Sequence, residues 1–205
     1  REGATALDIS FPERGHGTIT FLRADDKVIP AYQHSKIVSE YFAHCEAERR
    51  KNYGQWARLV PGPSTVFPNM SYLPRQPRTI SAWHPRGPDS HEAWRWFLID
   101  KNAPAEVKEF LRHYYISYSG PAGLTEQDDM ENWNYAHTAS SGVIARRHHY
   151  NYEMGLDMGQ GQGDPDFQDD GLKLPGLVLD TTQARAGEQN QRAFYSRWSA
   201  LMENG

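Results

Sequence analysis

The sequence predicts an α+β domain in which a curved antiparallel sheet carries helices on one face. Short apolar stretches separated by Pro and Gly fill residues 56–100, and such tight turns join antiparallel strands, whereas parallel strands need long crossovers. Segments with apolar residues three and four positions apart lie before and after this region, which is the spacing of amphipathic helices. A length of 205 residues accommodates one full hydrophobic core and argues against two.

The first third of the chain predicts one strand and one helix. Residues 1–33 contain few helical signals, and a β-branched and aromatic stretch at 18–22 follows the turn Gly15-His16-Gly17, which favours a short strand. From 35 to 51 the apolar residues recur at helical spacing, with charged residues on the opposite side. We therefore expect an amphipathic surface helix over 35–51.

The middle of the chain predicts a run of strands and then two helices. The expected strands are 56–60, 64–67, 71–73, 78–84 and 92–100. Pro104 suits the first turn of a helix that continues through Tyr118 and ends at Gly120-Pro121. A further helix is expected to begin near 124–126 and to pass Trp133.

The last fifty residues predict a loop and a closing helix. The stretch 155–171 is rich in Gly and acidic residues, which is typical of an extended surface loop. From about residue 187 an apolar stripe that includes Phe194 and Trp198 returns at helical spacing, so we expect the chain to close on a helix.

Composition excludes several classes of function. A net charge of -4 and a pI near 6.1 offer no basic face for phosphate, so no nucleic-acid partner is expected. The apolar stretches are shorter than a membrane span, and no membrane partner is expected. The single cysteine, Cys45, rules out an internal disulfide and any cysteine-based iron–sulfur or zinc site made by this chain alone, which favours a cytoplasmic protein. Because the chain begins at Arg1, we expect a front part of the protein to be missing from it.

The segment 120–133 carries the strongest chemical signal. Four acids, Glu126, Asp128, Asp129 and Glu131, fall within six residues at a predicted helix start. One interpretation is structural, because acids in a first turn accept from free backbone N–H groups and suit the helix dipole. The other is that one carboxylate points inward and binds a cation. The pattern alone favours the structural interpretation.

The same segment resembles a stretch of the large (alpha) subunits of Rieske-type aromatic-ring-hydroxylating dioxygenases, where a Gly-Pro-Ala-Gly turn precedes an acidic motif ending in Asn-Trp. The resemblance extends through nearly the whole chain. It includes segments 15–17, 65–71, 92–100 and 191–198. Segment 132–156 most resembles members that act on polycyclic or dibenzofuran-like aromatics. By this resemblance, residues 1–205 are the C-terminal part of the catalytic domain, with a helix-grip fold of the Bet v 1 and START type.

The resemblance implies a mononuclear Fe(II) site. In the family, the second Asp of the adjacent pair completes a two-histidine, one-carboxylate triad, and Asp129 matches it here. Such a triad occupies one face of the iron and leaves the opposite positions open for dioxygen. Both histidine ligands and the [2Fe-2S] Rieske domain would lie before residue 1. The nine histidines present are therefore expected in structural or surface roles.

The reaction implied is the addition of O2 to an aromatic ring to give a cis-dihydrodiol. Electrons would come from NADH through a reductase and a ferredoxin, and the subunit would assemble with beta subunits as alpha3beta3. The residues that match pocket positions of the family are Pro61, Pro63, Leu73, Gln76, Ser119 and Thr125. Many relatives carry a bulky aromatic where this chain has Ser119 and Thr125, so a multi-ring substrate is expected. Alternatively, Ser119 simply ends a helix, and Thr125 is an N-cap serving the Asp128 amide.

Two other functions stay open at this point. The isolated segment is expected to be inactive, and the helix-grip architecture is shared by proteins that only bind hydrophobic ligands in a cavity. A Rieske monooxygenase or demethylase would use the same scaffold as a dioxygenase.

Overall fold

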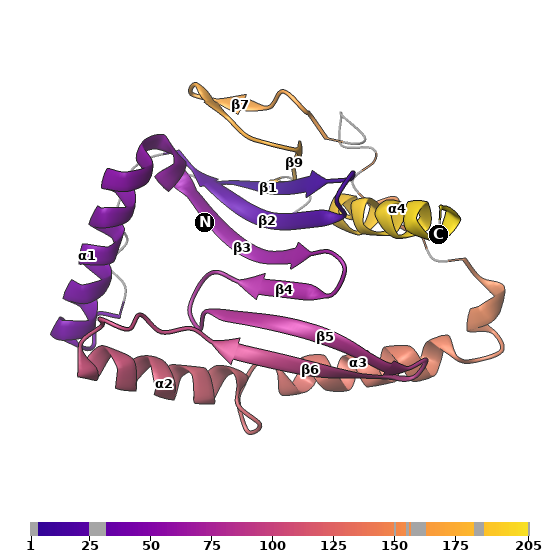
Figure 1. The fold of residues 1–205 in the computed structure, drawn as a ribbon, viewed down its shortest axis with the longest axis horizontal. Helices are drawn as coiled ribbons and strands as arrows, with labels where there is room; N and C mark the ends of the chain where they lie inside the picture. Colours follow the sequence, from indigo (N-terminus) through magenta and orange to yellow (C-terminus); the bar gives the residue numbers. More distant parts are fainter. Residues whose placement is uncertain are drawn as a thin grey trace.

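A seven-stranded antiparallel sheet forms the centre of the computed structural model, which describes residues 4–24, 32–149, 151–154, 156, 163–182 and 187–204 (Figure 1). The strand order is β6-β5-β4-β3-β2-β1-β9. The strands are β1 (Ala4–Phe11), β2 (His16–Arg23), β3 (Leu59–Val66), β4 (Met70–Leu73), β5 (Thr79–Gly87), β6 (Ser90–Phe97) and β9 (Leu177–Asp180). Neighbouring strands are consecutive in the chain except β9, which returns to pair with β1.

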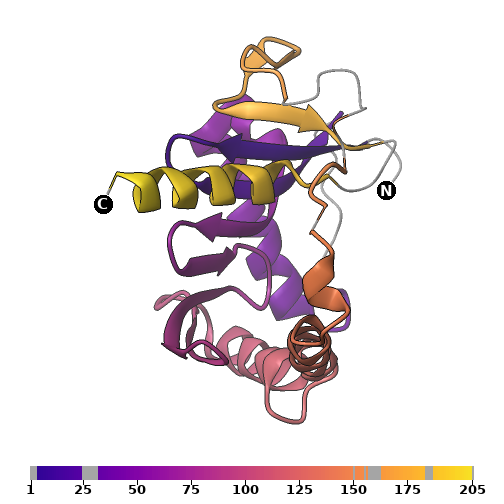
Figure 2. The same cartoon turned by 90° about the vertical axis from the view of Figure 1, so that its right-hand side faces the viewer.

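Four α-helices accompany the sheet in the described part of the chain. They are α1 (Lys36–Tyr53), α2 (Ala105–Ser119), α3 (Gln127–Ser140) and α4 (Gln189–Glu203). Two short 3-10 helices, η1 (Gly54–Arg58) and η2 (Ala145–Arg147), and a small hairpin of β7 (Gln168–Asp169) and β8 (Leu172–Lys173) complete the elements. Figure 1 shows α2 and α3 following one another along the β5 and β6 side of the sheet, and Figure 2 shows α4 lying across β1 and β2. None of the helices in the described residues combines the length and hydropathy needed to cross a bilayer.

The strand register places α3 and α4 on the same face of the sheet. Directly opposed residues of neighbouring strands point to one face, and the register aligns Gly17, Thr65, Ser71, Ser81 and Arg95 in one row. At one end of this row, a Cβ on Gly17 would meet the Asn190 side chain of α4. At the other end, Arg95 forms an ion pair with Glu126 at the start of α3. The predicted α+β class with a curved antiparallel sheet is confirmed.

The hydrophobic core has two parts. One lies at the β1 end of the sheet beneath the β7–β8 hairpin, and its buried residues are Leu7, Ile9, Leu22, Leu172, Leu174 and Val178. The other joins α1 and α2, and its buried residues are Val38, Ala103, Val107 and Leu111. Helix α1 contributes Val38 to this second core. Ser35 caps the helix by accepting from the Val38 N–H at 3.3 Å. Helix α3 belongs to neither part and has no buried residue.

The structure corrects the predicted strands around residue 60. Trp56 to Arg58 form η1 instead of a strand, and β3 then runs without a break from Leu59 to Val66. The two predicted strands form one strand because Pro61-Gly62-Pro63 sits at a bulge in the pairing with β2. The regular pattern of backbone hydrogen bonds is interrupted at a bulge, so prolines, which have no N–H to donate, are tolerated there. Gly62 is needed there, since a Cβ would lie 2.7 Å from the Ile19 carbonyl oxygen. Strands β1 and β9 lie in segments for which the sequence predicts no strand.

The predicted loop over 155–171 is partly wrong. Residues 155 and 157–162 lie outside the described residues. Farther on, Asp164 exchanges backbone hydrogen bonds with Val178, and β7 pairs with β8. This part of the chain therefore extends the sheet region and covers the first core. The closing helix, predicted from about 187, begins at Gln189.

Candidate functional site

The turn between α2 and α3 folds back on the end of α2. The Leu124 N–H donates to the Ser117 carbonyl at 2.9 Å, the Thr125 N–H to the Tyr118 carbonyl at 3.3 Å, and the Gly123 N–H to the Gly120 carbonyl at 2.8 Å. These bonds use carbonyls that the last turn of α2 would otherwise leave unpaired. The start of α3 is consequently set by the end of α2.

Both glycines of the Gly-Pro-Ala-Gly motif stand where the backbone leaves no room for a side chain. A Cβ on Gly120 would lie 2.4 Å from the Ile116 carbonyl oxygen, and a Cβ on Gly123 would lie 2.7 Å from the Tyr118 carbonyl oxygen. Real side chains do not approach backbone so closely, so any other residue would push the turn apart. The motif makes possible a reversal compact enough to bring the acidic segment against the sheet.

Glu126 is the acid that joins this turn to the sheet. Its carboxylate accepts a hydrogen bond from Ser119 Oγ at 2.9 Å and forms an ion pair with the Arg95 guanidinium of β6. Arg95 Nε in turn donates to Ser81 Oγ of β5 at 3.1 Å. The Glu126 and Arg95 side chains are only 13% and 19% exposed. Glu126 is also the residue that precedes α3, which makes the alternative role of Thr125 as the N-cap wrong.

Asp129 lies on the first turn of α3, beside the face that meets the sheet. Trp133 of α3 contacts Trp83 of β5 with ring centroids 5.9 Å apart, and Asp129 is four residues before Trp133, on the same face of the helix. Asp128 is five residues before Trp133, roughly 140° away around the axis. The Asp129 side chain is exposed and makes no hydrogen bond or ion pair with any residue that the structure describes. Its oxygens are free to bind a cation.

The register places some of the predicted pocket residues on the face that carries α3. Pro63 is two residues before Thr65 in β3, and Leu73 is two residues after Ser71 in β4, so both point toward that face. Pro61 is paired with Thr20 across the bulge and is outside this row. Gln76 lies between β4 and β5, where its Oε1 accepts from the Arg78 N–H at 3.2 Å.

The remaining two predicted pocket residues belong to the α2–α3 turn. The Ser119 hydroxyl donates its hydrogen bond to the Glu126 carboxylate. Thr125 is half-buried, and its backbone N–H donates to the Tyr118 carbonyl of α2. No contact that the structure provides joins Asp129 to any of the six positions. The pocket composition therefore stays a prediction.

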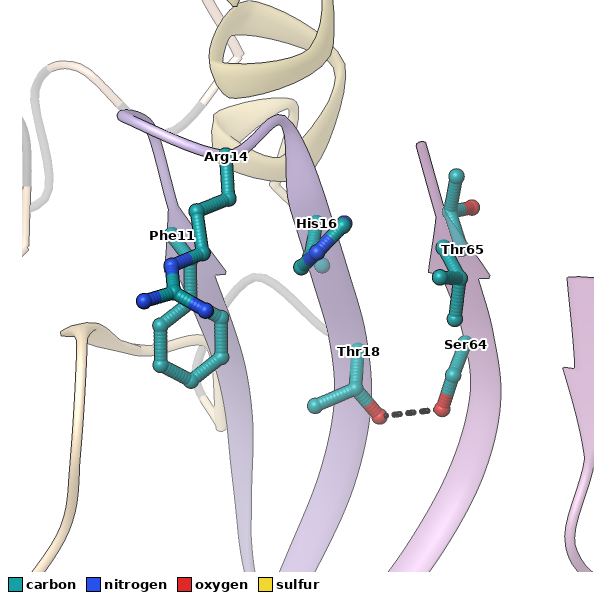
Figure 3. A pocket seen from close by; sticks show the side chains of 8 residues that line it. Phe11, Arg14, His16, Thr18, Ser64 and Thr65 are labelled. Atoms are coloured by element: carbon teal, nitrogen blue, oxygen red, sulfur yellow. Dashed lines mark hydrogen bonds between the residues drawn. The ribbon is translucent and has the colours of Figure 1, made fainter. Parts of the chain in front are cut away.

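A surface cavity of about 460 Å³ lies elsewhere, at the ends of β1, β2 and β3 (Figure 3). It is lined by Phe11, Arg14, His16, Gly17, Thr18, Ser64, Thr65 and Val66. His16 Nδ1 accepts from the Phe67 N–H at 3.0 Å, and Ser64 Oγ donates to Thr18 Oγ1 at 2.8 Å. Neither this cavity nor a second one of about 320 Å³ beside Arg58 includes Asp129 or a predicted pocket residue.

A metal centre cannot be completed from the residues that the structure describes. They contain no cluster of three or more His, Cys, Asp or Glu arranged to hold a metal ion. Two of the histidines pair with acids of this chain: His113 Nε2 lies 2.8 Å from Glu109 Oε1 on α2, and His137 Nε2 lies 3.2 Å from Asp89 Oδ1. Asp129 offers one carboxylate, which fits the single oxygen ligand of an iron site with two imidazoles. The imidazoles would have to come from another segment or chain.

Sequence reasoning missed Arg95 as a site residue and left Glu126 unassigned among the four acids. The available signal was that Arg95 is the one cation among the aromatic residues of the predicted strand 92–100. A charge in such a strand needs a buried partner if it faces the core. Glu126 could have been named as that partner only if the turn geometry had been known.

Three comparisons with known proteins agree with each other. A family model described as "Ring hydroxylating alpha subunit (catalytic domain)" matches residues 8–204. Biphenyl 2,3-dioxygenase subunit alpha of Rhodococcus jostii (strain RHA1) is 35% identical over 193 residues, which are 92% of this chain and 39% of that protein. A benzene 1,2-dioxygenase subunit alpha of Pseudomonas putida is 30% identical over 192 residues, which are 92% and 40% of the two chains.

The fold agrees with solved structures. The crystal structure of naphthalene 1,2-dioxygenase from Rhodococcus sp. bound to indole superposes with a TM-score of 0.67 at 27% identity, covering 96% of this chain and 44% of that one. The chain spans about two fifths of the length of these curated relatives.

Proposed function

Because the chain belongs to the family of ring-hydroxylating alpha subunits, we propose that residues 1–205 form the C-terminal part of the mononuclear-iron catalytic domain of an aromatic-ring dioxygenase. The complete enzyme adds both atoms of O2 to an aromatic ring and yields a cis-dihydrodiol. The observation that carries this proposal is the unpaired carboxylate of Asp129 on the sheet-facing side of α3, three residues after Glu126, whose own carboxylate is already bound by Arg95 and Ser119.

Asp129 is the iron ligand contributed by this chain. The structural role and the ligand role fall to two different acids of the segment. Glu126 is paired with Arg95, while Asp129 keeps its oxygens free. When bound, the iron supplies open coordination positions at which dioxygen is activated beside the substrate. The two imidazole ligands and the [2Fe-2S] Rieske cluster belong to parts of the protein other than residues 1–205.

The sheet face shared with α3 supports the substrate. Pro63 and Leu73 present apolar surface toward that side, which excludes water and favours an arene. Pro61, Gln76, Ser119 and Thr125 complete the proposed lining. Thr125 has a small side chain four residues before Asp129 in the sequence, so we propose a fused or multi-ring arene as the substrate class, in keeping with the relative named for biphenyl.

Substrate size can be tested on the complete enzyme. We expect naphthalene or biphenyl to be oxidised faster than benzene or toluene. Thr125→Phe is expected to shift the ratio of kcat/KM values toward the smaller rings by about tenfold or more, because filling space the size of a ring affects substrate binding more than a single methylene does. A wild-type enzyme that prefers benzene would overturn the multi-ring assignment.

Electron delivery and assembly follow the family pattern in this proposal. NADH is oxidised by a reductase, a ferredoxin carries electrons to the Rieske cluster, and alpha and beta subunits assemble as alpha3beta3 in the cytoplasm. A monooxygenase or demethylase on the same scaffold is distinguished by product analysis, because it inserts one oxygen atom instead of two.

The iron assignment is tested by elemental analysis of the full-length protein. Asp129→Ala is expected to lose mononuclear iron and keep Rieske iron, whereas Asp128→Ala, a matched control on the far side of the helix, is expected to keep both. If neither substitution changes the iron content, Asp129 is only a helix-start acid. The chain would then be better described as a hydrophobic-ligand-binding module.

A further inference from the structure

We infer that Arg95 is a positioning residue for the iron site: through Glu126 it fixes the first turn of α3 against the sheet and thereby sets where Asp129 stands. This inference rests on the proposed function, because it assigns a role relative to the Asp129 ligand. It adds two residues that sequence reasoning left without any role at the site.

The contacts form one continuous connection from the sheet to both helices. Ser81 of β5 accepts from Arg95 Nε at 3.1 Å, Arg95 forms its ion pair with Glu126, and Ser119 at the end of α2 donates to the same carboxylate at 2.9 Å. Ser81 is buried, so the guanidinium is held in place from the sheet side. The planar guanidinium and the two-oxygen carboxylate give this link a defined direction as well as a defined length.

Other contacts between α3 and the sheet are weaker. The ion pair between His137 and Asp89 joins side chains that are 51% and 79% exposed, and such pairs hold little. The Trp133 ring that contacts Trp83 is itself exposed on its other side. Because α3 has no buried residue, its packing does not fix its position. The Arg95–Glu126 pair is the one contact of α3 with the sheet, among the described residues, in which both side chains are largely buried.

The distance from this pair to Asp129 is short. Glu126 precedes Asp129 by three residues, which is less than one helical turn and a rise of about 4.5 Å. A rotation of the first turn of α3 therefore moves the Asp129 carboxylate almost as far as it moves Glu126. Metal ligands must be held to within about 0.5 Å to bind productively. We therefore expect loss of the pair to displace the Asp129 carboxylate by more than this tolerance.

The test compares iron(II) binding by the full-length protein in its complete assembly. The variants are Arg95→Ala, Glu126→Gln and the charge exchange Arg95→Glu with Glu126→Arg. We expect the two single variants to bind mononuclear iron(II) about 10- to 100-fold more weakly, which is the usual effect of removing a residue that orients a metal ligand. The charge exchange is expected to recover part of that loss. Arg86→Ala, which breaks the exposed Arg86–Glu92 pair on the same hairpin, is the matched control and is expected to bind iron normally.

Two further readouts separate positioning from general damage. The Rieske absorbance and the alpha–beta assembly report overall folding and should be unchanged in Glu126→Gln. After saturation with iron, kcat should fall in Glu126→Gln while KM stays within about twofold, since a displaced ligand affects the reacting centre and leaves remote substrate contacts intact.

The outcomes distinguish this inference from the proposal on which it rests. If Asp129→Ala keeps its iron, the proposed function fails. If Asp129→Ala loses iron but Glu126→Gln and the charge exchange bind it with wild-type affinity, the ligand assignment stands and the positioning role is overturned. If iron affinity falls equally in Arg86→Ala, the effect belongs to the hairpin as a whole, and the role assigned to Arg95 is also overturned.

Discussion

Replacing Glu46 with Gln should lower the stability of the domain more than any other single charge change on α1. Its carboxylate receives Arg23 Nη2 at 3.0 Å, Arg49 Nε at 2.8 Å and Arg50 Nε at 3.0 Å. Arg23 lies on β2, so the cluster joins α1 to the sheet, and Arg49 also donates to the Leu59 carbonyl at the start of β3. One carboxylate is thus shared by three guanidinium groups, one from the sheet and two from α1.

The magnitude follows from the pKa of the Glu46 carboxyl. Burial acts to raise this pKa, but hydrogen bonds from Arg49, Arg50 and Arg23 outweigh it and lower the pKa from 4.5 to about 2. Each pKa unit corresponds to about 1.4 kcal/mol, so the ionised form contributes about 3 kcal/mol. Because the side chain is 21% exposed, screening reduces this to about 2 to 3 kcal/mol. For a domain of this size the loss corresponds to a drop of roughly 5 to 10 °C in Tm.

The assay is thermal unfolding of the full-length protein at pH 7 and at stepwise lower pH. A lowered folded-state pKa means that the stabilisation is present above pH 4.5 and is lost as the pH falls toward 2, so the difference between wild type and Glu46→Gln should shrink over that interval. Glu40→Gln is the control on the same helix, because its pair with Lys36 spans 3.7 Å between exposed side chains and is worth less than about 0.5 kcal/mol. Equal Tm values for the two variants would refute the reasoning.

Three other substitutions test separate parts of the structure. Burial raises the pKa of the Asp8 carboxyl from 3.8 to about 6, although the positive charge of Arg192 acts to lower it. Between these two pH values the folded state keeps this carboxyl protonated while the unfolded state does not. The free energy of unfolding therefore falls as the pH rises from about 4 to 6. Asp8→Asn should flatten that slope, gaining about 2 to 3 kcal/mol relative to wild type between pH 4.5 and 7.5, and an unchanged slope in urea unfolding would contradict it. Gly123→Ala places a Cβ 2.7 Å from a carbonyl oxygen and should cost about 1 to 3 kcal/mol and lower the iron content; wild-type values of both would show that the turn is not constrained. Leu111→Ala removes a buried side chain of the second core and should cost about 2 to 5 kcal/mol, measured by the urea midpoint, with little effect on iron affinity.

Much of the architecture could be predicted because local patterns agree with the fold. Helix α1 has its cap and its spacing in the sequence, and α2 ends where Gly120 and Pro121 predict. The pairing of β5 with β6 follows from two adjacent strand-forming stretches with a short turn. These elements are specified by residues within a few positions of each other.

The rest depended on contacts between distant residues. In β1, Asp8 and Ser10 are buried against α4, where Gln189 Nε2 donates to Ser10 Oγ at 2.9 Å, so polar residues occupy what the pattern would assign to solvent. Strand β9 is only four residues long and forms because β1 offers it an edge. The same limit applies to the site. Resemblance identifies Asp129 from the sequence, whereas Arg95 and Glu126 meet only after the sheet and the α2–α3 turn are in place.

The pairing of β1 with β9 has a consequence for the order in which the domain is completed during synthesis. Strand β1 leaves the ribosome early in the synthesis of this segment. The second strand that pairs with it, β9, consists of residues 177–180 and emerges much later. Until those residues emerge, one edge of β1 has no strand beside it, and Leu7 and Ile9 of the first core lack Val178. An open edge of this kind can pair with another nascent chain, and closing so long a loop is slow. Translation that pauses before residue 177 should therefore favour aggregation of this segment, and release after residue 180 should suppress it.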